Sequence, residues 1–261
     1  MKNNQLPLSE DFIAYKDHNL SVLRGAILVG KTINTDLDTS WVLSQVKRLA
    51  NDIAIHDDEN GSDTLLSSFR NSGFRGASDY YNYANSDIES VLKERVGIPI
   101  TLAVLLMSVA DELGINNSGI NFPAHFLVSI GNRLVDPFSM TFVADDTLRH
   151  WLERSRVPRN EALRRARPCQ MVVRMLNNLK ALAVAQSDFI KALDFSGYQL
   201  LVADNVFSLY LERAELWTRL EVPTMAVKEL EHASDIAPDP ETSTALKKQI
   251  EDLTQSVTKL H

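Results

Sequence analysis

Hydrophobic residues spaced three and four apart predict helices in the N-terminal part of the chain. Residues 20–28 and 41–53 follow this spacing, which gathers their apolar side chains on one face of a helix. The stretch Asp36 to Thr39 supplies capping side chains before the second of these helices. Residues 98–113 are apolar on nearly every face. We therefore expect a central, buried helix there, ending at Gly114.

Short β-rich runs after the buried helix predict a small antiparallel sheet. A two-residue linker beginning at Gly131 is a good hairpin signal. Placing Ile130 opposite Arg133 makes His125 a diagonal neighbour of Asp136 on one face, where a histidine could reach the carboxylate. The expected strands lie near residues 119–122, 124–130 and 133–137.

From Met171 onward the pattern predicts helices alone, with a weak repeat. Ala192 and Ala226 are 34 residues apart, as are Leu182 and Leu216, and this is the period of tetratricopeptide repeats. We expect two domains, 1–168 and 169–261, the second with repeat units near 173–206 and 207–240 and a capping helix over 241–260. In the second unit the signature positions are occupied by Tyr210, Ala214, Trp217, Ala226, Leu230, Ala233 and Pro238.

Composition narrows the class of protein. A hydrophobic content of 44% in 261 residues is ordinary for a folded protein. The single cysteine, Cys169, excludes an internal disulfide and fits a reducing compartment. No apolar run approaches the roughly 20 residues of a membrane span, and the first residues lead into no apolar signal core. We expect a cytoplasmic protein without a membrane anchor.

Charge is unevenly distributed. A net charge of −7 argues against general nucleic-acid binding. The segment Arg149–Arg167 nevertheless holds seven arginines against Glu153 and Glu161. Such a block is usually a solvated helix face or an intramolecular docking strip. The alternative is an anion-binding or RNA-contacting patch, the one place where nucleic acid is expected to bind if it binds at all.

The acidic run His56–Gly61 could suggest a metal site. Consecutive carboxylates point in different directions, and the spacing of a calcium loop is absent. We interpret this run as a solvated loop, and we expect neither a metal nor another cofactor.

Three separated pieces carry the candidate chemistry: Arg95-Val96-Gly97-Ile98-Pro99, Pro123-Ala124-His125-Phe126 and Val135-Asp136-Pro137-Phe138. Their order resembles the Cys-His-Asp site of papain-like and transglutaminase-like domains, with Pro99 in the position of the nucleophile. A catalytic cysteine acts as a thiolate, favoured by a helix N-terminus and an adjacent imidazolium. Proline supplies no such group. Cys169 lies on a different element, and we expect it not to be catalytic.

Further motifs extend the resemblance along nearly the whole chain. They are Asn85-Ser86, Gly97-Ile98-Pro99-Ile100-Thr101-Leu102, Phe122-Pro123-Ala124-His125-Phe126-Leu127 and Arg174-Met175-Leu176-Asn177-Asn178-Leu179-Lys180. On these residues the chain resembles the bacterial SirB-one-type family. The resemblance implies an α+β, mostly helical protein: a papain/transglutaminase-like core with a small antiparallel sheet, followed by tetratricopeptide-like helices.

Two functional hypotheses follow. The first is a non-catalytic scaffold or regulatory protein that binds a protein or peptide partner through its cleft and helical repeats. The candidate cleft residues are Tyr80, Tyr81, Asn85, Arg95, Phe126, Arg174 and Asn178. The second is a hydrolase or acyltransferase in which Thr101 replaces the nucleophile and acts with His125 and Asp136, although a threonine inside a helix commonly bonds to the backbone. Under the first hypothesis, a thiol introduced at Pro99 would be activated by His125.

Overall fold

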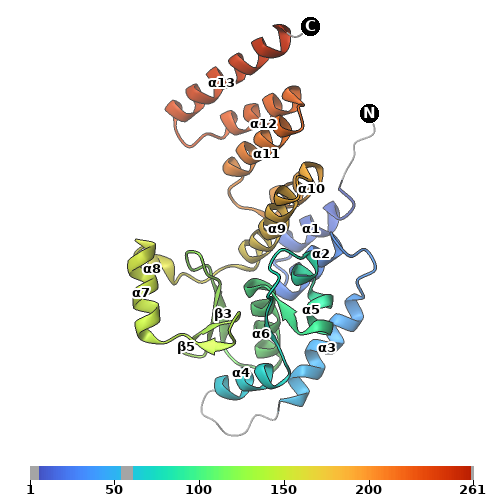
Figure 1. Ribbon diagram of the computed structural model, residues 1–261, viewed down its shortest axis with the longest axis vertical. Coiled ribbons are helices and arrows are strands. Elements are labelled where there is room, and N and C mark those ends of the chain that lie inside the picture. Colours follow the sequence, from blue (N-terminus) through green and yellow to red (C-terminus); the bar gives the residue numbers. More distant parts are fainter. Residues whose placement is uncertain (1–5, 54–60, 260–261) are drawn as a thin grey trace. The chain divides into compact units, whose positions relative to one another are not determined.

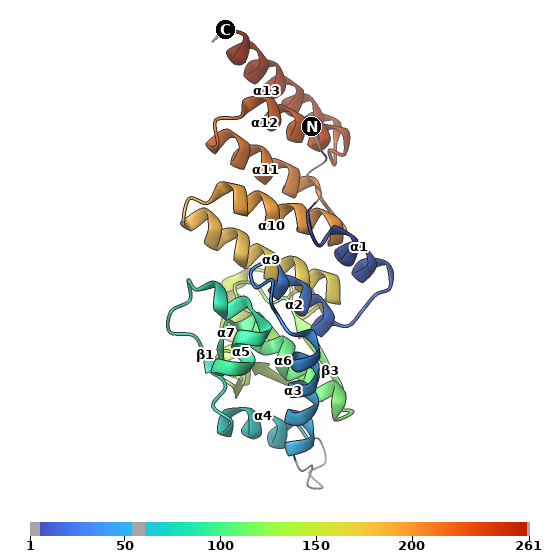
Figure 2. The same ribbon diagram turned by 90° about the vertical axis from the view of Figure 1, so that its right-hand side faces the viewer.

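The computed structural model describes residues 6–53 and 61–259 (Figures 1 and 2), with side chains described as far as residue 255. Helices dominate and two small sheets accompany them, which confirms the predicted α+β, mostly helical class. The chain divides into two compact units. The first unit spans Glu10–Met175. The second consists of Leu176 onward together with the residues before Glu10. The predicted boundary at 168 falls at the start of helix α9, before this division.

A buried helix organises the first unit. Every residue of α6 from Ile100 to Ala110 is buried, as its all-round apolar sequence predicts. It contacts α2, α3 and the strands β3 and β4. The helices up to this point are α1 (Ser9–Asp17), α2 (Val22–Lys31), α3 (Thr39–Asp52), α4 (Ser62–Asn71), α5 (Ile88–Glu94) and α6 (Pro99–Glu112).

Local capping explains where two of these helices begin. Asp38, within the predicted capping stretch, accepts a hydrogen bond from the backbone nitrogen of Trp41 at 2.9 Å and starts α3. The N-cap of α5 is Asp87 and not the neighbouring Ser86, which is also a residue type that favours this position. Asp87 caps α5 by accepting from the Glu89 nitrogen at 3.0 Å, and Ser86 ends a short 3₁₀ helix, Tyr83–Ser86. The carboxylate is the acceptor because it lies at the non-helical N-cap position.

The four-stranded sheet is antiparallel, in the order β3–β4–β5–β6. The register pairs Ile130 with Arg133, as the hairpin prediction requires. The strands are β3 (Asn117–Ile120), β4 (Leu127–Ile130), β5 (Arg133–Asp136) and β6 (Thr141–Phe142). A second, two-stranded sheet pairs β1 (Arg75–Gly76) in parallel with β2 (Val96–Gly97).

The two faces of the larger sheet pack against different helices. Val128 and Ile130 are fully buried, and their strand β4 contacts α6. On the opposite face, Leu127 joins a core cluster with Leu148 and Trp151. That cluster covers the sheet with α7 (Asp145–Ser155) and α8 (Arg159–Ala162). Alternate residues of a strand therefore face either α6 or α7.

The second unit is a series of antiparallel helices. They are α9 (Pro168–Ala185), which begins in the first unit, α10 (Phe189–Val202), α11 (Phe207–Arg219), α12 (Pro223–Asp235) and α13 (Pro240–Lys259). The last of these agrees with the predicted capping helix over 241–260. Ala226 and Ala233 are fully buried, as close packing of α11 and α12 requires. Tyr210 and Trp217 are only half-buried. The assignment to tetratricopeptide repeats stays a prediction.

The sequence also predicted that no segment spans a membrane and that the acidic run His56–Gly61 is a loop. In the described part of the chain, no helix combines the length and apolar character that crossing a bilayer requires. The acidic run His56–Gly61 lies outside the described residues except for Gly61, which precedes α4 in a left-handed conformation with φ of 57°.

Candidate functional site

Pro99 is the first residue of α6. Its ring suits this position because the first-turn nitrogen has no partner inside the helix. The preceding residue, Ile98, is the N-cap and provides no side-chain hydrogen bond. Its backbone nitrogen donates to the carbonyl of Asn85 at 3.4 Å. The buried helix therefore begins where the sequence motif places it, and the first side chain it presents has no ionisable group.

The candidate base faces a different helix from the one that begins at Pro99. The His125 ring stacks on Trp151 of α7, with centroids 4.1 Å apart and planes at 19°. It also lies 6.1 Å from the ring of Phe122. Ala124 adopts a left-handed conformation, with φ of 62°. The resulting turn places His125 before the first residue of β4, Leu127. Its environment is the α7 face of the sheet.

Asp136 is engaged by its own turn. Its Oδ1 accepts from the Phe138 nitrogen at 3.0 Å and its Oδ2 accepts from the Ser139 hydroxyl at 2.7 Å. Among the described residues, no hydrogen bond joins its carboxylate to His125. The predicted hairpin register is confirmed, whereas the placement of His125 and Asp136 as near neighbours on one face stays a prediction. The following Asp-x-x-Ser sequence, which favours a local turn, is the signal that points to the observed partners.

The hydroxyl groups of α6 give no support to a replacement nucleophile. Thr101 is fully buried, and its hydroxyl has no hydrogen-bond partner in the described chain. The expected bond from Thr101 to the helix backbone is therefore absent. Ser108 forms one instead, donating to the carbonyl of Val104 at 2.7 Å. A substrate reaching the first turn of α6 would meet neither hydroxyl.

Cys169 occupies the first turn of α9 and is half-buried. Its neighbour is Tyr15 of α1. Burial, and secondly the nearby thiol, raise the pKa of that phenol. The thiol thus belongs to the packing of α1 on α9 rather than to the α7 face that holds His125.

Four of the predicted cleft residues lie together. The Arg174 guanidinium donates to the carbonyl of His125 at 2.9 Å and lies 5.4 Å from the centroid of the Phe126 ring. Burial lowers the pKa of Arg174, and the nearby Tyr80 opposes this effect. Tyr80 forms an edge contact with Tyr81, with centroids 6.1 Å apart. Arg174 also donates to the Asn121 side chain at 3.4 Å. Asn121 was not among the predicted cleft residues.

Two of the other predicted cleft residues, Asn85 and Arg95, make contacts inside the first unit. Asn85 is buried and donates from its side chain to the Asp79 carbonyl at 2.6 Å. Arg95 ends α5 in the left-handed conformation, with φ of 61°, and its guanidinium carbon lies 4.6 Å from the centroid of the Phe74 ring. Burial lowers the pKa of Arg95. Asn178, on α9 in the second unit, is half-buried.

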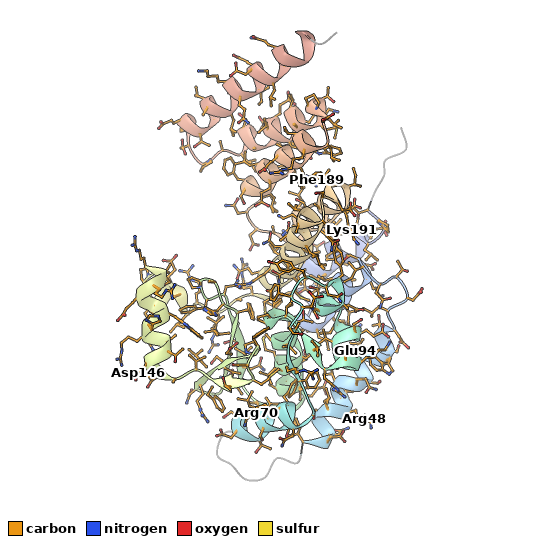
Figure 3. The ribbon with its side chains drawn as sticks, in the orientation of Figure 1. Arg48, Arg70, Glu94, Asp146, Phe189 and Lys191 are labelled. Atoms are coloured by element: carbon orange, nitrogen blue, oxygen red, sulfur yellow. The ribbon has the colours of Figure 1, made fainter. Side chains whose placement is uncertain are left out.

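Residues 77–82 connect β1 to the 3₁₀ helix and contain Tyr80 and Tyr81, and we call them the tyrosine loop. A shallow cavity of about 260 Å³ adjoins this loop. Asp79 and Glu94 line it, and Glu94 extends from the end of α5 in Figure 3. Tyr81 is 71% exposed and Tyr80 is 45% exposed. Two exposed aromatic rings beside acidic side chains are typical of a binding surface rather than of a core.

Comparison with known protein families assigns the first unit to a family. Residues 40–177, which include α6, both sheets and α7, match the model of the transglutaminase-like superfamily. The chain belongs to the transglutaminase-like superfamily. The match ends within α9, so the helices from α10 onward lie outside the matched part of this transglutaminase-like protein.

Relatives along the full length identify the branch. A UPF0162 protein of Vibrio cholerae is 26% identical over 92% of this chain and 93% of its own length. The protein SirB1 of Salmonella typhimurium is 23% identical over 95% of this chain and 98% of its own length. A UPF0162 protein of Xylella fastidiosa is 31% identical, over 51% of this chain and 52% of its own length. These relatives confirm the SirB-type assignment within the transglutaminase-like superfamily. No solved structure matches the chain.

Proposed function

We propose that this transglutaminase-like protein is a non-catalytic scaffold that binds a protein or peptide partner. The observation that carries the proposal is Pro99 at the first position of α6. Nucleophilic catalysis in this architecture needs a thiol or hydroxyl at the helix start, activated by a neighbouring base. Proline can be neither nucleophile nor proton donor.

The surroundings of Pro99 support the same proposal. His125 stacks on Trp151, and Asp136 accepts two hydrogen bonds from its own turn. A base serves a nucleophile only within hydrogen-bond reach, about 2.6–3.2 Å between heavy atoms. These side chains therefore act as packing and turn-forming groups. With Thr101 buried, the hydrolase alternative has no accessible group to carry it.

The tyrosine loop is the binding surface that we favour. Tyr81 and Tyr80 expose large rings, and tyrosine often dominates the binding energy of protein interfaces. Asp79 and Glu94 in the adjoining cavity complement a basic side chain. Arg174, whose guanidinium donates to the His125 carbonyl, lies close enough to Tyr80 to interact with it electrostatically. The partner is expected to present a basic residue beside an apolar one.

The first test introduces a thiol at the position of the nucleophile. In a Cys169→Ser background, the Pro99→Cys thiol should show a pKa at or slightly below the ordinary value of about 8.5, lowered only by the start of α6. Adding His125→Ala should leave this pKa unchanged, because His125 stacks on Trp151 instead. The measurement is the rate of iodoacetamide alkylation against pH.

Two results would count against this account, the first against the observed placement of His125 and the second against the non-catalytic proposal. The first is a strongly lowered thiol pKa in Pro99→Cys that rises when His125 is removed, as the sequence hypothesis predicts. The histidine would then reach position 99 instead of staying stacked on Trp151. The second is covalent labelling of Thr101 in the wild-type protein by a fluorophosphonate probe. The Cys169→Ser protein without a thiol at position 99 supplies the background rate.

The second test concerns binding. Tyr81→Ala should lose at least about tenfold in affinity for the partner, as expected when an interface aromatic is truncated. Partners are recovered with the wild-type protein, identified, and then titrated as purified components. Ile13→Ala is the matched control, because Ile13 is also exposed, at 42%, but lies on α1, outside the tyrosine loop and the predicted repeats. Equal affinities for the wild type and Tyr81→Ala would remove the tyrosine loop from the proposal.

A further inference from the structure

A larger cavity lies on the opposite side of the sheet from α6. It measures about 680 Å³, opens to solvent, and is lined by residues of β3 to β6 and of the helices α7 and α8. Asp146, on the first turn of α7, marks this side of the first unit in Figure 3. The volume falls within the roughly 300–1,000 Å³ of typical small-molecule sites. The non-catalytic proposal assigns no role to this cavity.

Two serines form part of the strand wall of the cavity. Ser118 of β3 and Ser129 of β4 are cross-strand partners, and both line it. The Ser129 hydroxyl donates to the Gly131 carbonyl at 3.4 Å. The Ser118 hydroxyl is buried and has no hydrogen-bond partner in the described chain. A buried hydroxyl without a partner costs free energy, which a ligand oxygen accepting from it would recover.

Three arginines bring positive charge to the same cavity: Arg133, Arg159 and Arg165. Arg133 is bonded to Asp63 at 2.7 Å. No acidic side chain of the described residues forms a salt bridge with Arg159 or Arg165. Asp145 is the acidic residue of the lining, and it leaves an excess of positive charge.

The two unpaired arginines are held in place by their backbones. Arg165 forms a bridge with Ile120 on the free edge of β3, and the next nitrogen, of Ala166, donates to the Gly119 carbonyl at 2.8 Å. Arg159 is the first residue of α8, and its carbonyl accepts from the Leu163 nitrogen at 3.0 Å. The side chains therefore reach the cavity from fixed points rather than from a loose loop.

We propose that this cavity binds a small phosphorylated organic molecule. Its phosphate accepts hydrogen bonds from Arg159, Arg165 and the Ser118 hydroxyl, while its organic part packs against Leu134, Leu148 and Leu163, which also line the cavity. Guanidinium groups bind phosphate oxygens through strong, charge-assisted pairs. A dianionic phosphate matches two unpaired arginines better than a single carboxylate does. The arginine-rich segment thus has a ligand chemistry of its own.

The probe is 1-naphthyl phosphate, titrated into the full-length protein by calorimetry. We expect one binding site, with weaker binding of 1-naphthoate and of inorganic phosphate and no measurable binding of 1-naphthol. Arg165→Ala and Arg159→Ala should each weaken binding by about tenfold or more, because each removes a charge-assisted bond. Both side chains are exposed, and circular dichroism verifies that the variants fold.

Two matched variants sharpen the test. Arg154→Ala removes the same charge from an exposed arginine of α7 that does not line the cavity, so its affinity should equal that of the wild type. Ser118→Ala should weaken binding several-fold and leave the unliganded protein no less stable, because the lost hydroxyl has no partner.

Three outcomes would overturn the proposal. They are no binding of 1-naphthyl phosphate, binding that Arg154→Ala weakens as much as Arg165→Ala does, and stronger binding of a twelve-nucleotide oligouridylate that depends equally on all exposed arginines. The last would indicate a surface for RNA.

Discussion

Replacing Glu229 with alanine is expected to destabilise the helical second unit by about 3–5 kcal/mol. Glu229 of α12 accepts from the Arg213 guanidinium of α11 at 2.8 and 2.9 Å. Its oxygen also accepts from the Trp217 indole at 3.2 Å. The side chains of the pair are only 14% and 8% exposed. Removing the carboxylate leaves a buried guanidinium whose remaining described partner is the Leu193 carbonyl, at 3.0 Å.

Urea unfolding measures this loss, and hydrogen exchange of peptides from α11 and α12 locates it. Glu215→Ala is the control, since Glu215 pairs with Arg219 at 2.9 Å on the surface, with both side chains more than half exposed. An exposed pair contributes about 0–1 kcal/mol. Equal losses in the two variants would mean that the Arg213–Glu229 pair is not a buried support. The double variant Arg213→Met/Glu229→Leu should recover most of the stability, because no unpaired charge remains.

A comparable loss is expected in the first unit from Leu105→Ala, at about 2–5 kcal/mol. Leu105 is fully buried in the middle of α6. Truncation removes apolar contacts and leaves a cavity that the surrounding helices and strands cannot fill completely. Leu113→Ala, at the half-buried C-terminal end of the same helix, should cost clearly less.

Unfolding of both leucine variants is followed by urea titration, with hydrogen exchange of α6 peptides as the local measurement. A loss below about 1 kcal/mol for Leu105→Ala would mean that the surrounding core closes around the deleted methyl groups. That result would remove α6 as the rigid support on which the candidate site is built.

The sequence pattern predicted correctly the parts of the fold that one local feature determines, such as an apolar run or a glycine turn. The all-round apolar run from Ile98 predicted a buried helix because such a surface can be stabilised only inside a core. The Gly131 linker predicted the hairpin register because turn length and register are coupled. The sequence alone does not decide the first residue of α5, because Ser86 and Asp87 are both residue types that cap helices. Only the backbone conformation at position 87, with φ of −86° and ψ of 113°, decides between them.

The candidate site was harder to predict than the fold. Sequence order placed His125 and Asp136 on neighbouring strands. This is correct for Asp136, the last residue of β5, but His125 lies two residues before β4. Sequence order could not show that the turn at Ala124 removes His125 from the ladder, or that Trp151, distant in sequence, offers a ring to stack on. The cavity beside α7 depends on residues from four strands and two helices. Only the arginine-rich composition of its wall was visible beforehand.

The turn that engages Asp136 also affects what a cysteine at position 99 could achieve. One substitution would place a cysteine at position 99, yet the Asp136 carboxylate would still accept hydrogen bonds from the Phe138 nitrogen and the Ser139 hydroxyl. Phe138 in turn is held against β1, where its carbonyl accepts from the Gly76 nitrogen at 3.0 Å and its ring leaves no room for a side chain on Gly76. A thiol at position 99 would therefore leave the Asp136 carboxylate with the same two partners in its own turn. Under the proposed function, the packing of Phe138 against β1 and the turn at Asp136 hold this carboxylate in a structural role, whatever residue stands at position 99.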